Sequence, residues 1–305
     1  MEGKVALITG GGGGIGWGIA TEFAREGAKV ALVDIDEKRG QEVLDLVKKI
    51  SPTHYFYQAD IRDINSFKSL LDKIETDLGG VDVLVNNAGV NTPHSFLNMT
   101  PEAFDQVFET NLRGHFFLSQ EVAKQMIAMK KSGVIIFITS IHQEVVQGHP
   151  HYSASKAALA MLVKEMAVEL ASYGIRVNGI APGGIYVEKK VEDPLLANDE
   201  PSVILGGKNG IPRDIGRAAV MLASEYWSRH ITGEILTVSG GQYLLPASRE
   251  ACKKNYFLKR TTPLKWSTRI PRCECISSPR CGKLLGFLES FGGFFFFAHF
   301  LVKNA

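Results

Sequence analysis

The chain has 305 residues, 45% of them hydrophobic, so it can bury a core as large as that of a single α/β domain. Its net charge of +2 is unevenly distributed: residues 246–305 hold 11 Lys and Arg against 3 Asp and Glu, whereas residues 1–245 hold 23 against 29. A mildly acidic segment without cysteine excludes disulfides and cysteine-ligated zinc, and offers no basic face to nucleic acid. We therefore expect no metal and no nucleic-acid partner. The first residues contain no basic leader or long apolar stretch, so we expect a cytoplasmic protein.

Short apolar runs alternate with longer helical patterns along the chain. An apolar run at residues 5–9 precedes a helical pattern over 15–26, and a second run at 30–34 precedes a charged amphipathic stretch over 36–50. Further strands are predicted at 55–59, 81–86, 134–140, 177–181 and 235–238, with long helices over 103–130 and 152–171. The run at 134–138 is apolar on both faces, which suits a parallel sheet covered on both sides. The sequence predicts a Rossmann-type, doubly wound α/β fold of about seven parallel strands.

The first predicted strand leads into a glycine-rich turn that opens the first predicted helix. Residues without a Cβ let the backbone turn tightly and approach a pyrophosphate at a helix N-terminus. The run fits two dinucleotide-binding registers, G-x-x-x-G-x-G and G-x-G-x-x-G, and a flexible loop without a ligand is the alternative. The candidate cofactor contacts in this turn are Gly10, Gly12, Gly13, Gly14, Ile15 and Gly16.

Asp34 ends the second predicted strand, 18 residues after Gly16 and near the ~20 expected of a ribose-binding acid. Its carboxylate can accept hydrogen bonds from both adenosine ribose hydroxyls, and its charge repels a 2′-phosphate. Because the nearby positions 13 and 35 carry no cation, we predict NAD in preference to NADP; an ordinary loop acid is the alternative. Further candidate contacts follow the third and fourth strands, although their residue types also favour turns. These are Asp60, Ile61, Asn87 and Gly89.

Tyr152 and Lys156 are four residues apart at the start of a predicted helix, a spacing that places both on one face. A nearby cation favours the phenolate and moves the tyrosine pKa towards working pH, so Tyr152 is a candidate general acid/base. A chance pair is the alternative. Ser140 follows a strongly apolar strand and can hydrogen-bond a substrate oxygen, and Asn111 lies within the preceding long helix.

In order and spacing, these motifs resemble the short-chain dehydrogenase/reductase family over residues 2 to about 245. The resemblance implies that Tyr152 exchanges the proton and that Ser140 polarises the substrate oxygen. It further implies that Lys156 binds the nicotinamide ribose and lowers the tyrosine pKa, while Asn111 holds a water of the proton relay. The nicotinamide would transfer the hydride to or from a secondary alcohol or ketone. The set comprises residues 9–16 and 86–89, Asn111, Ser140, Tyr152, Lys156, Pro182 and Gly183.

Residues 178–185 are similar to the family segment beneath the nicotinamide, with Pro182, Gly183 and Ile185 as candidate contacts. The threonine usual two residues beyond Ile185 is Val187 here, which leaves the carboxamide or phosphate contact open. Residues 187–209 occupy the place of the family's substrate lid, with a solvated loop as the alternative. In the final strand, Ser239 stands where aspartate is common in the family.

Polar residues crowd the segment between Ser140 and Tyr152 and predict a polar pocket: His142, Gln143, Glu144, His149 and His151. The segment is similar to the sugar and polyol dehydrogenases of the family, so we expect a carbohydrate hydroxyl as substrate, contacted by Ser140, His142, Gln143 and Tyr152. Reduction of a 3-oxoacyl thioester is the alternative, since the framework also resembles acyl-carrier-protein reductases; Asp34 argues against it because that reaction in the family generally uses NADPH. A non-catalytic dinucleotide-binding scaffold is an alternative of another class.

The resemblance implies a homo-oligomer, with a tetramer as the predicted state, and the two long predicted helices carry apolar residues on more than one face. We expect one catalytic domain at 1–245 and an irregular tail at 246–305 that is not a folded domain. The tail holds all 4 cysteines and 8 of the 17 Phe. A frame-shifted or read-through extension is the preferred interpretation. A membrane-associating stretch at 284–302 and a metal site at Cys273, Cys275 and Cys281 are the alternatives.

Overall fold

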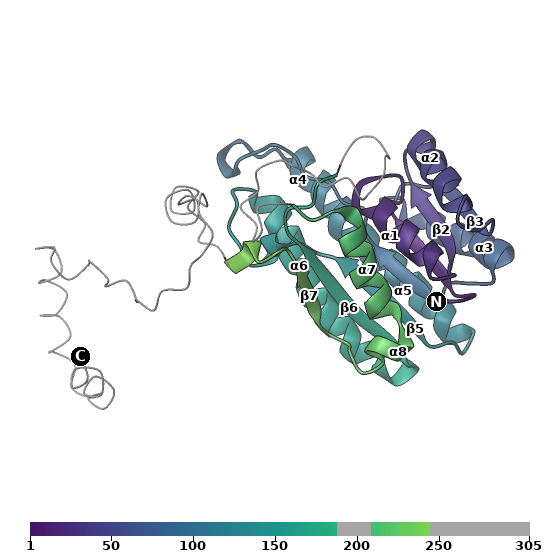
Figure 1. The fold of residues 1–305 in the computed structure, drawn as a ribbon. Coiled ribbons are helices and arrows are strands. Elements are labelled where there is room, and N and C mark those ends of the chain that lie inside the picture. The colour runs from purple at the N-terminus through teal and green to yellow at the C-terminus, as the bar shows by residue number, and fades with distance from the viewer. Residues whose placement is uncertain (188–208, 245–305) are drawn as a thin grey trace, which may run out of the picture. The chain divides into compact units, whose positions relative to one another are not determined.

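Seven parallel strands form one sheet in the computed structural model, which describes residues 1–187 and 209–244 (Figure 1). The strand order is β3-β2-β1-β4-β5-β6-β7, so the chain reverses its direction of travel across the sheet between β1 and β4. The predicted doubly wound fold is confirmed. The strands are β1 (Val5–Thr9), β2 (Lys29–Asp34), β3 (His54–Gln58), β4 (Val83–Asn86), β5 (Gly133–Ile138), β6 (Ile175–Pro182) and β7 (Ile235–Val238).

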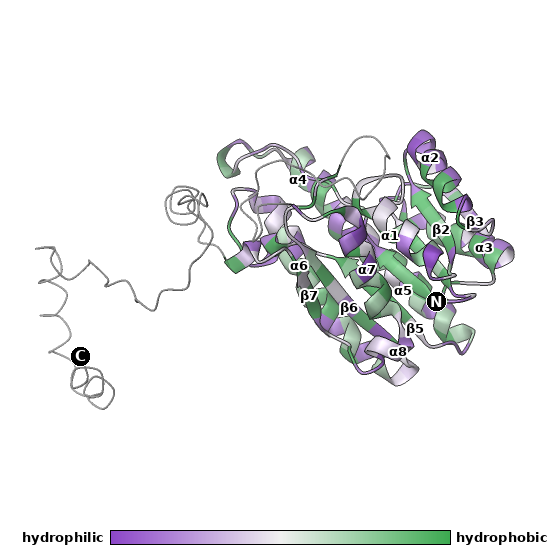
Figure 2. Cartoon of the chain, viewed as in Figure 1, coloured by the Kyte–Doolittle hydropathy of each residue, from purple (hydrophilic) through white to green (hydrophobic). Residues whose placement is uncertain are grey.

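Helices cover both faces of the sheet. One face packs against α1 (Gly14–Arg25), α2 (Glu37–Lys48) and α7 (Pro212–Ala223), and the other against α3 (Phe67–Leu78), α5 (His115–Ala128) and α6 (Pro150–Leu170). Side chains of β1 alternate between the two cores, Leu7 in one and Ile8 in the other. Figure 2 shows hydrophobic strands at the centre and polar residues on the outer helix surfaces. This two-sided burial explains why the strands read as continuous apolar runs.

The long helix predicted over 103–130 is interrupted. It consists of α4 (Pro101–Phe108), a π-helical turn at Glu109–Gly114, and α5. Contacts with distant parts of the chain accompany the wider turn: the side chain of Asn111 bonds the backbone of Val90, and a Cβ at Gly114 would clash with the carbonyl of Ile61. Single π turns within helices are often found at functional sites.

The glycine turn is anchored by close packing of α1 against α7 (Figure 1). A Cβ at Gly18 would clash with Pro212, and a Cβ at Gly216 would lie 2.5 Å from the carbonyl oxygen of Gly18. The buried Glu22 of α1 pairs with Arg213 and lies 3.8 Å from Arg217, both on α7. These contacts hold the start of α1 in place.

The remaining helical elements are short: α8 (Glu225–Ser228) and the 3-10 turns Ile64–Ser66, Phe96–Asn98, Ile141–Gln143, Ala171–Tyr173 and Gln242–Leu244. Within residues 1–187 and 209–244, no helix has both the length and the apolarity that a membrane span requires. In the same ranges, no cluster of three His, Cys, Asp or Glu side chains could hold a metal ion. Most of the lid segment predicted at 187–209 and all of the tail at 246–305 lie outside the described residues.

Candidate active site

A cavity of about 590 Å³ opens at the carboxyl ends of the central strands, where the strand order reverses. In doubly wound sheets this is the position at which ligands bind. The cavity joins the glycine turn and Asp34 at one end to Tyr152 and Ser140 at the other. The predicted site residues that line it are Gly10, Gly12, Gly13, Gly14, Ile15, Asp34, Asn87, Gly89, Ser140, His142, Tyr152, Lys156, Pro182 and Gly183.

The backbone of the glycine turn distinguishes between the two predicted registers. Gly10 and Gly14 have positive φ angles of 62° and 53°, which side-chain-bearing residues rarely adopt. A Cβ at Gly16 would clash with the carbonyl of Gly10, whereas a Cβ at Gly13 would meet no atom within 4 Å. Glycine is therefore required by the backbone at Gly10 and Gly14 and by close packing at Gly16, and these three positions form the G-x-x-x-G-x-G register.

The start of α1 is suited to an anion. Its N-cap is Gly13, which has no side chain to satisfy the N–H groups of the first helical turn. Asn87 braces the preceding turn, because its Nδ2 donates to the carbonyl oxygens of Thr9 at 2.9 Å and Gly10 at 3.0 Å. The Thr9 hydroxyl in turn accepts from the backbone N–H of Asn87 at 3.0 Å. The turn is thus prearranged to receive a phosphate.

Asp34 faces the same turn from the end of β2. Its Oδ2 accepts a hydrogen bond from the N–H of Gly12 at 2.8 Å, and its Oδ1 accepts from the N–H of Asp36 at 2.9 Å. The expectation that no cation lies nearby was wrong, because Arg39 also lines this end of the cavity. Arg39 is brought there by the cap of α2, in which Asp36 accepts from the N–H of Arg39 at 3.1 Å. Its guanidinium Nε lies 3.5 Å from the Asp36 carboxylate.

Six predicted site residues do not line the cavity: Gly16, Asp60, Ile61, Asn111, Gln143 and Ile185. Asp60 is bound by Arg62 at 2.6 Å, and this bond holds the pKa of the Asp60 carboxyl below its usual range. Ile61 is buried against Gly114, Gln143 bonds its neighbour Glu144 at 3.2 Å, and Ile185 forms a β-bridge with Gly210.

Tyr152 and Lys156 lie one turn apart on α6, and the Lys156 Nζ is 5.7 Å from the centroid of the Tyr152 ring. Lys156 is buried and donates to the carbonyl oxygen of Ile138 at 2.8 Å, and burial lowers its pKa to about 8. Burial raises the pKa of Tyr152, and a hydrogen bond with Ser140 acts in the opposite direction. Desolvation thus has the larger effect on the tyrosine here.

Asn111 acts behind the cavity wall. Its Oδ1 accepts from the N–H of Val90 at 2.8 Å, and its Nδ2 donates to the Val90 carbonyl at 2.9 Å and to the Ser155 hydroxyl at 3.2 Å. Its own carbonyl accepts from Nδ1 of His115 at 2.9 Å. His115, which the sequence analysis did not single out, is completely buried, and burial together with the charge of Lys156 lowers its pKa to about 3.

The substrate end of the cavity carries several neutral polar groups. The Ser140 hydroxyl caps the turn Ile141–Gln143 by accepting from the N–H of His142 at 3.2 Å. The His142 ring packs edge to face against the Tyr152 ring, with 5.2 Å between the ring centroids and 89° between the ring planes. His149 and Asn91 complete this end, although Asn91 was not predicted from the sequence. Asn91 lies on a loop, and only the folded chain brings it near His149.

Comparison with known proteins agrees with this geometry. Residues 11–242 match the family model described as enoyl-(acyl carrier protein) reductase. The chain is 38% identical to an uncharacterized oxidoreductase of Thermotoga maritima, over 79% of this chain and 96% of the relative. It is 36% identical to the 3-oxoacyl-[acyl-carrier-protein] reductase FabG of Escherichia coli, over 80% of this chain and 99% of the relative. The chain also aligns with a solved structure of 7α-hydroxysteroid dehydrogenase in complex with NADH and 7-oxo glycochenodeoxycholic acid. The TM-score is 0.70 and the identity 38%, over 79% of this chain and 94% of that structure's chain.

Proposed function

The chain belongs to the short-chain dehydrogenase/reductase family of oxidoreductases, and on this premise we propose that it transfers a hydride between NAD(H) and a secondary alcohol or ketone of the sugar or polyol class. The observation that carries the proposal is the cavity itself. It joins a glycine turn suited to a pyrophosphate to a Tyr152–Lys156 pair on one helical turn, with Ser140 bonded to the tyrosine.

The residues present fit a nicotinamide dinucleotide. The uncapped start of α1 suits the pyrophosphate, and the Asp34 carboxylate, which retains free lone pairs, suits the ribose hydroxyls. Asp34 favours NAD because its negative charge repels a 2′-phosphate. The positive charge of the exposed Arg39 weakens this repulsion only in part, because Arg39 is paired with Asp36. The bound nicotinamide supplies or accepts the hydride.

The proton steps belong to the chain's own side chains. In ketone reduction, Tyr152 gives its phenolic proton to the substrate oxygen while Ser140 donates a hydrogen bond to the same oxygen. Lys156 remains mainly protonated at pH 7, because its pKa of about 8 lies above that pH. Its charge stabilises the phenolate that remains, which offsets the effect of burial on the tyrosine. In alcohol oxidation the same groups act in reverse.

The proposal is tested by following NADH formation with NAD and a panel of polyols, aldoses, hydroxysteroids and 3-hydroxyacyl thioesters. Oxidation of a polyol or sugar would support it. Absence of NADH formation with every alcohol would refute it and favour a non-catalytic scaffold. The similarity to the E. coli 3-oxoacyl reductase makes thioester reduction the second candidate, so the panel is also run in reverse with NADPH and a 3-oxoacyl thioester.

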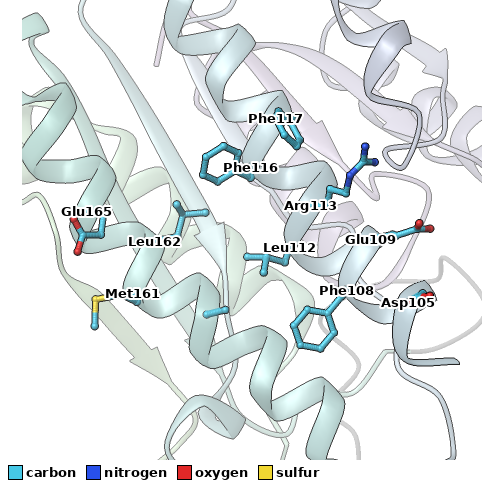
Figure 3. Close-up of a pocket in the computed structure, with 11 residues that line it drawn as sticks. Asp105, Phe108, Glu109, Leu112, Arg113, Phe116, Phe117, Met161, Leu162 and Glu165 are labelled. Carbon is cyan, nitrogen blue, oxygen red and sulfur yellow. The ribbon is translucent and has the colours of Figure 1, made fainter. Parts of the chain in front are cut away.

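We further propose that the protein is a homo-oligomer that pairs through the helices beside α6. An apolar groove of about 720 Å³ lies between the α4–α5 segment and α6 (Figure 3). Phe116 and Met161 there are 41% and 56% exposed, and acidic and basic side chains such as Glu165 and Arg113 border it. A two-fold partner would cover the apolar residues and pair these charges. A monomeric mass in light scattering, equal for the unmodified chain and Phe116→Asp, would contradict the proposal.

A further inference from the structure

The substrate end of the cavity is polar but carries little charge. Among the described residues that line the cavity, the charged side chains are Asp34, Arg39 and Lys156. The first two lie at the glycine turn, and Lys156 is buried and bonded to the Ile138 carbonyl. Among the described residues, the charged side chain beside Tyr152 is thus Lys156, whose Nζ is already bonded to a backbone carbonyl. The polar groups at this end are suited to uncharged oxygens.

Two histidines form the wall next to the reacting tyrosine. The ring of His142 lies edge to face on Tyr152, and the ring of His149 lies 5.8 Å from that of His142. Burial, and then the proximity of His149, lower the pKa of His142. The ring also has polar contacts of its own, because its Nδ1 lies 3.4 Å from the Ser153 hydroxyl and it hydrogen-bonds Gln147, and these contacts hold it in the wall.

Asn91 contacts the second histidine. Its amide Nδ2 lies 3.3 Å from Nδ1 of His149, and both residues line the cavity. This contact uses Nδ1 of the ring and the nitrogen of the amide. The Nε2 atom of His149 and the amide oxygen of Asn91 are therefore the polar atoms of the pair that could meet a substrate oxygen.

We propose that His142, His149 and Asn91 form a subsite for a second substrate oxygen, the hydroxyl on the carbon next to the reacting carbon. In the proposed reaction the substrate oxygen would bond Tyr152 and Ser140, which bond each other, and the histidine wall begins at the Tyr152 ring. A hydroxyl on the adjacent carbon is within one hydrogen-bond length of the reacting oxygen and thus within reach of this wall. The substrate class is then a vicinal diol, or its α-hydroxy ketone. This inference rests on the proposed hydride transfer.

The experiment compares trans-cyclohexane-1,2-diol with cyclohexanol, two alcohols that share one ring and differ by the neighbouring hydroxyl. With NAD and the full chain, kcat/KM for the diol should exceed that for cyclohexanol by about threefold to tenfold, as expected for one added hydrogen bond of about 1 kcal/mol. His149→Leu and His142→Phe should bring this ratio close to one, mainly by raising KM for the diol. Phenylalanine keeps the ring packed on Tyr152.

His230→Leu is the matched control, because His230 is an exposed histidine that does not line the cavity, and it should keep the ratio of the unmodified chain. NADH titration followed by fluorescence shows whether each variant has retained its fold. Equal kcat/KM for the two alcohols, or an unchanged ratio in both histidine variants, would overturn the inference and leave hydride transfer intact. Oxidation of a hydroxysteroid with neither cyclohexane compound oxidised would also overturn it. Failure with every alcohol would refute the proposed function and the inference together.

Discussion

The buried histidine near Lys156 should make the protein sensitive to acid. His115 has a pKa of about 3 in the folded chain, because burial and the charge of Lys156 disfavour its protonated form. In the unfolded chain a histidine titrates near ~6.5. Between these two values the unfolded state binds the additional proton, so stability rises with pH in this window and is lost as pH falls below about 6.5.

The magnitude follows from the difference between the two pKa values. From pH 7 to pH 5 the unfolded histidine becomes almost fully protonated while His115 stays neutral, so the free energy of unfolding should fall by about 2 kcal/mol on this account. His115→Phe removes the titrating group and should remove this part of the pH dependence. The unmodified chain and His115→Phe share all other titrating groups, so the contributions of those groups to the change in unfolding free energy between pH 7 and pH 5 cancel. A change in stability that is the same at both pH values cancels as well.

Urea denaturation followed by circular dichroism at pH 7 and pH 5 measures the effect in both proteins. His230→Phe is the matched control, since its exposed imidazole stays in contact with water, and it should behave like the unmodified chain. If the unmodified chain and His115→Phe lose the same free energy of unfolding between the two pH values, the histidine is not held neutral by burial and the reasoning is wrong.

Two further predictions concern the cofactor and the tail. Asp34→Ala should narrow the preference for NAD over NADP, because it removes the ribose acceptor and the charge that repels a 2′-phosphate; comparable kcat/KM for both cofactors in the unmodified chain would contradict the assignment. Truncation after Leu245 should leave kcat/KM and the oligomeric mass nearly unchanged, because all seven strands of the sheet and the described residues that line the cavity come before residue 245. Loss of either property would show that residues 246–305 belong to the folded enzyme.

The fold was predictable because strand burial leaves a direct mark on the sequence. β5 is buried at every position, and its apolar run on both faces indicates a covered parallel sheet. The glycine turn, Asp34 and the Tyr152–Lys156 pair were also recognisable, because each depends on spacing within one turn or one helix. These local relations survive in the linear sequence.

Features that arise from long-range contacts were not predictable. The π turn at Glu109–Gly114 depends on bonds between Asn111 and Val90, which are 21 residues apart. Arg39 does have a local signal, because Asp36 ahead of a charged helix indicates an N-cap that places residue 39 in the first helical turn. Asn91 and His149 meet across loops 58 residues apart, and no local pattern connects them.

Replacement of Tyr152 by phenylalanine tests the central claim most directly, because it deletes only the oxygen that exchanges the proton. Tyr152→Phe should lower the rate of NAD reduction by ~10²-fold or more, with whichever alcohol of the panel is oxidised fastest, while NADH affinity stays nearly unchanged. Lys156→Ala should reduce both the rate of NAD reduction and the affinity for NADH. The matched control for Tyr152→Phe is Tyr173→Phe, which changes an exposed tyrosine and should keep the original rate. A Tyr152→Phe protein that keeps more than about a tenth of the original rate would contradict general acid/base catalysis by this tyrosine.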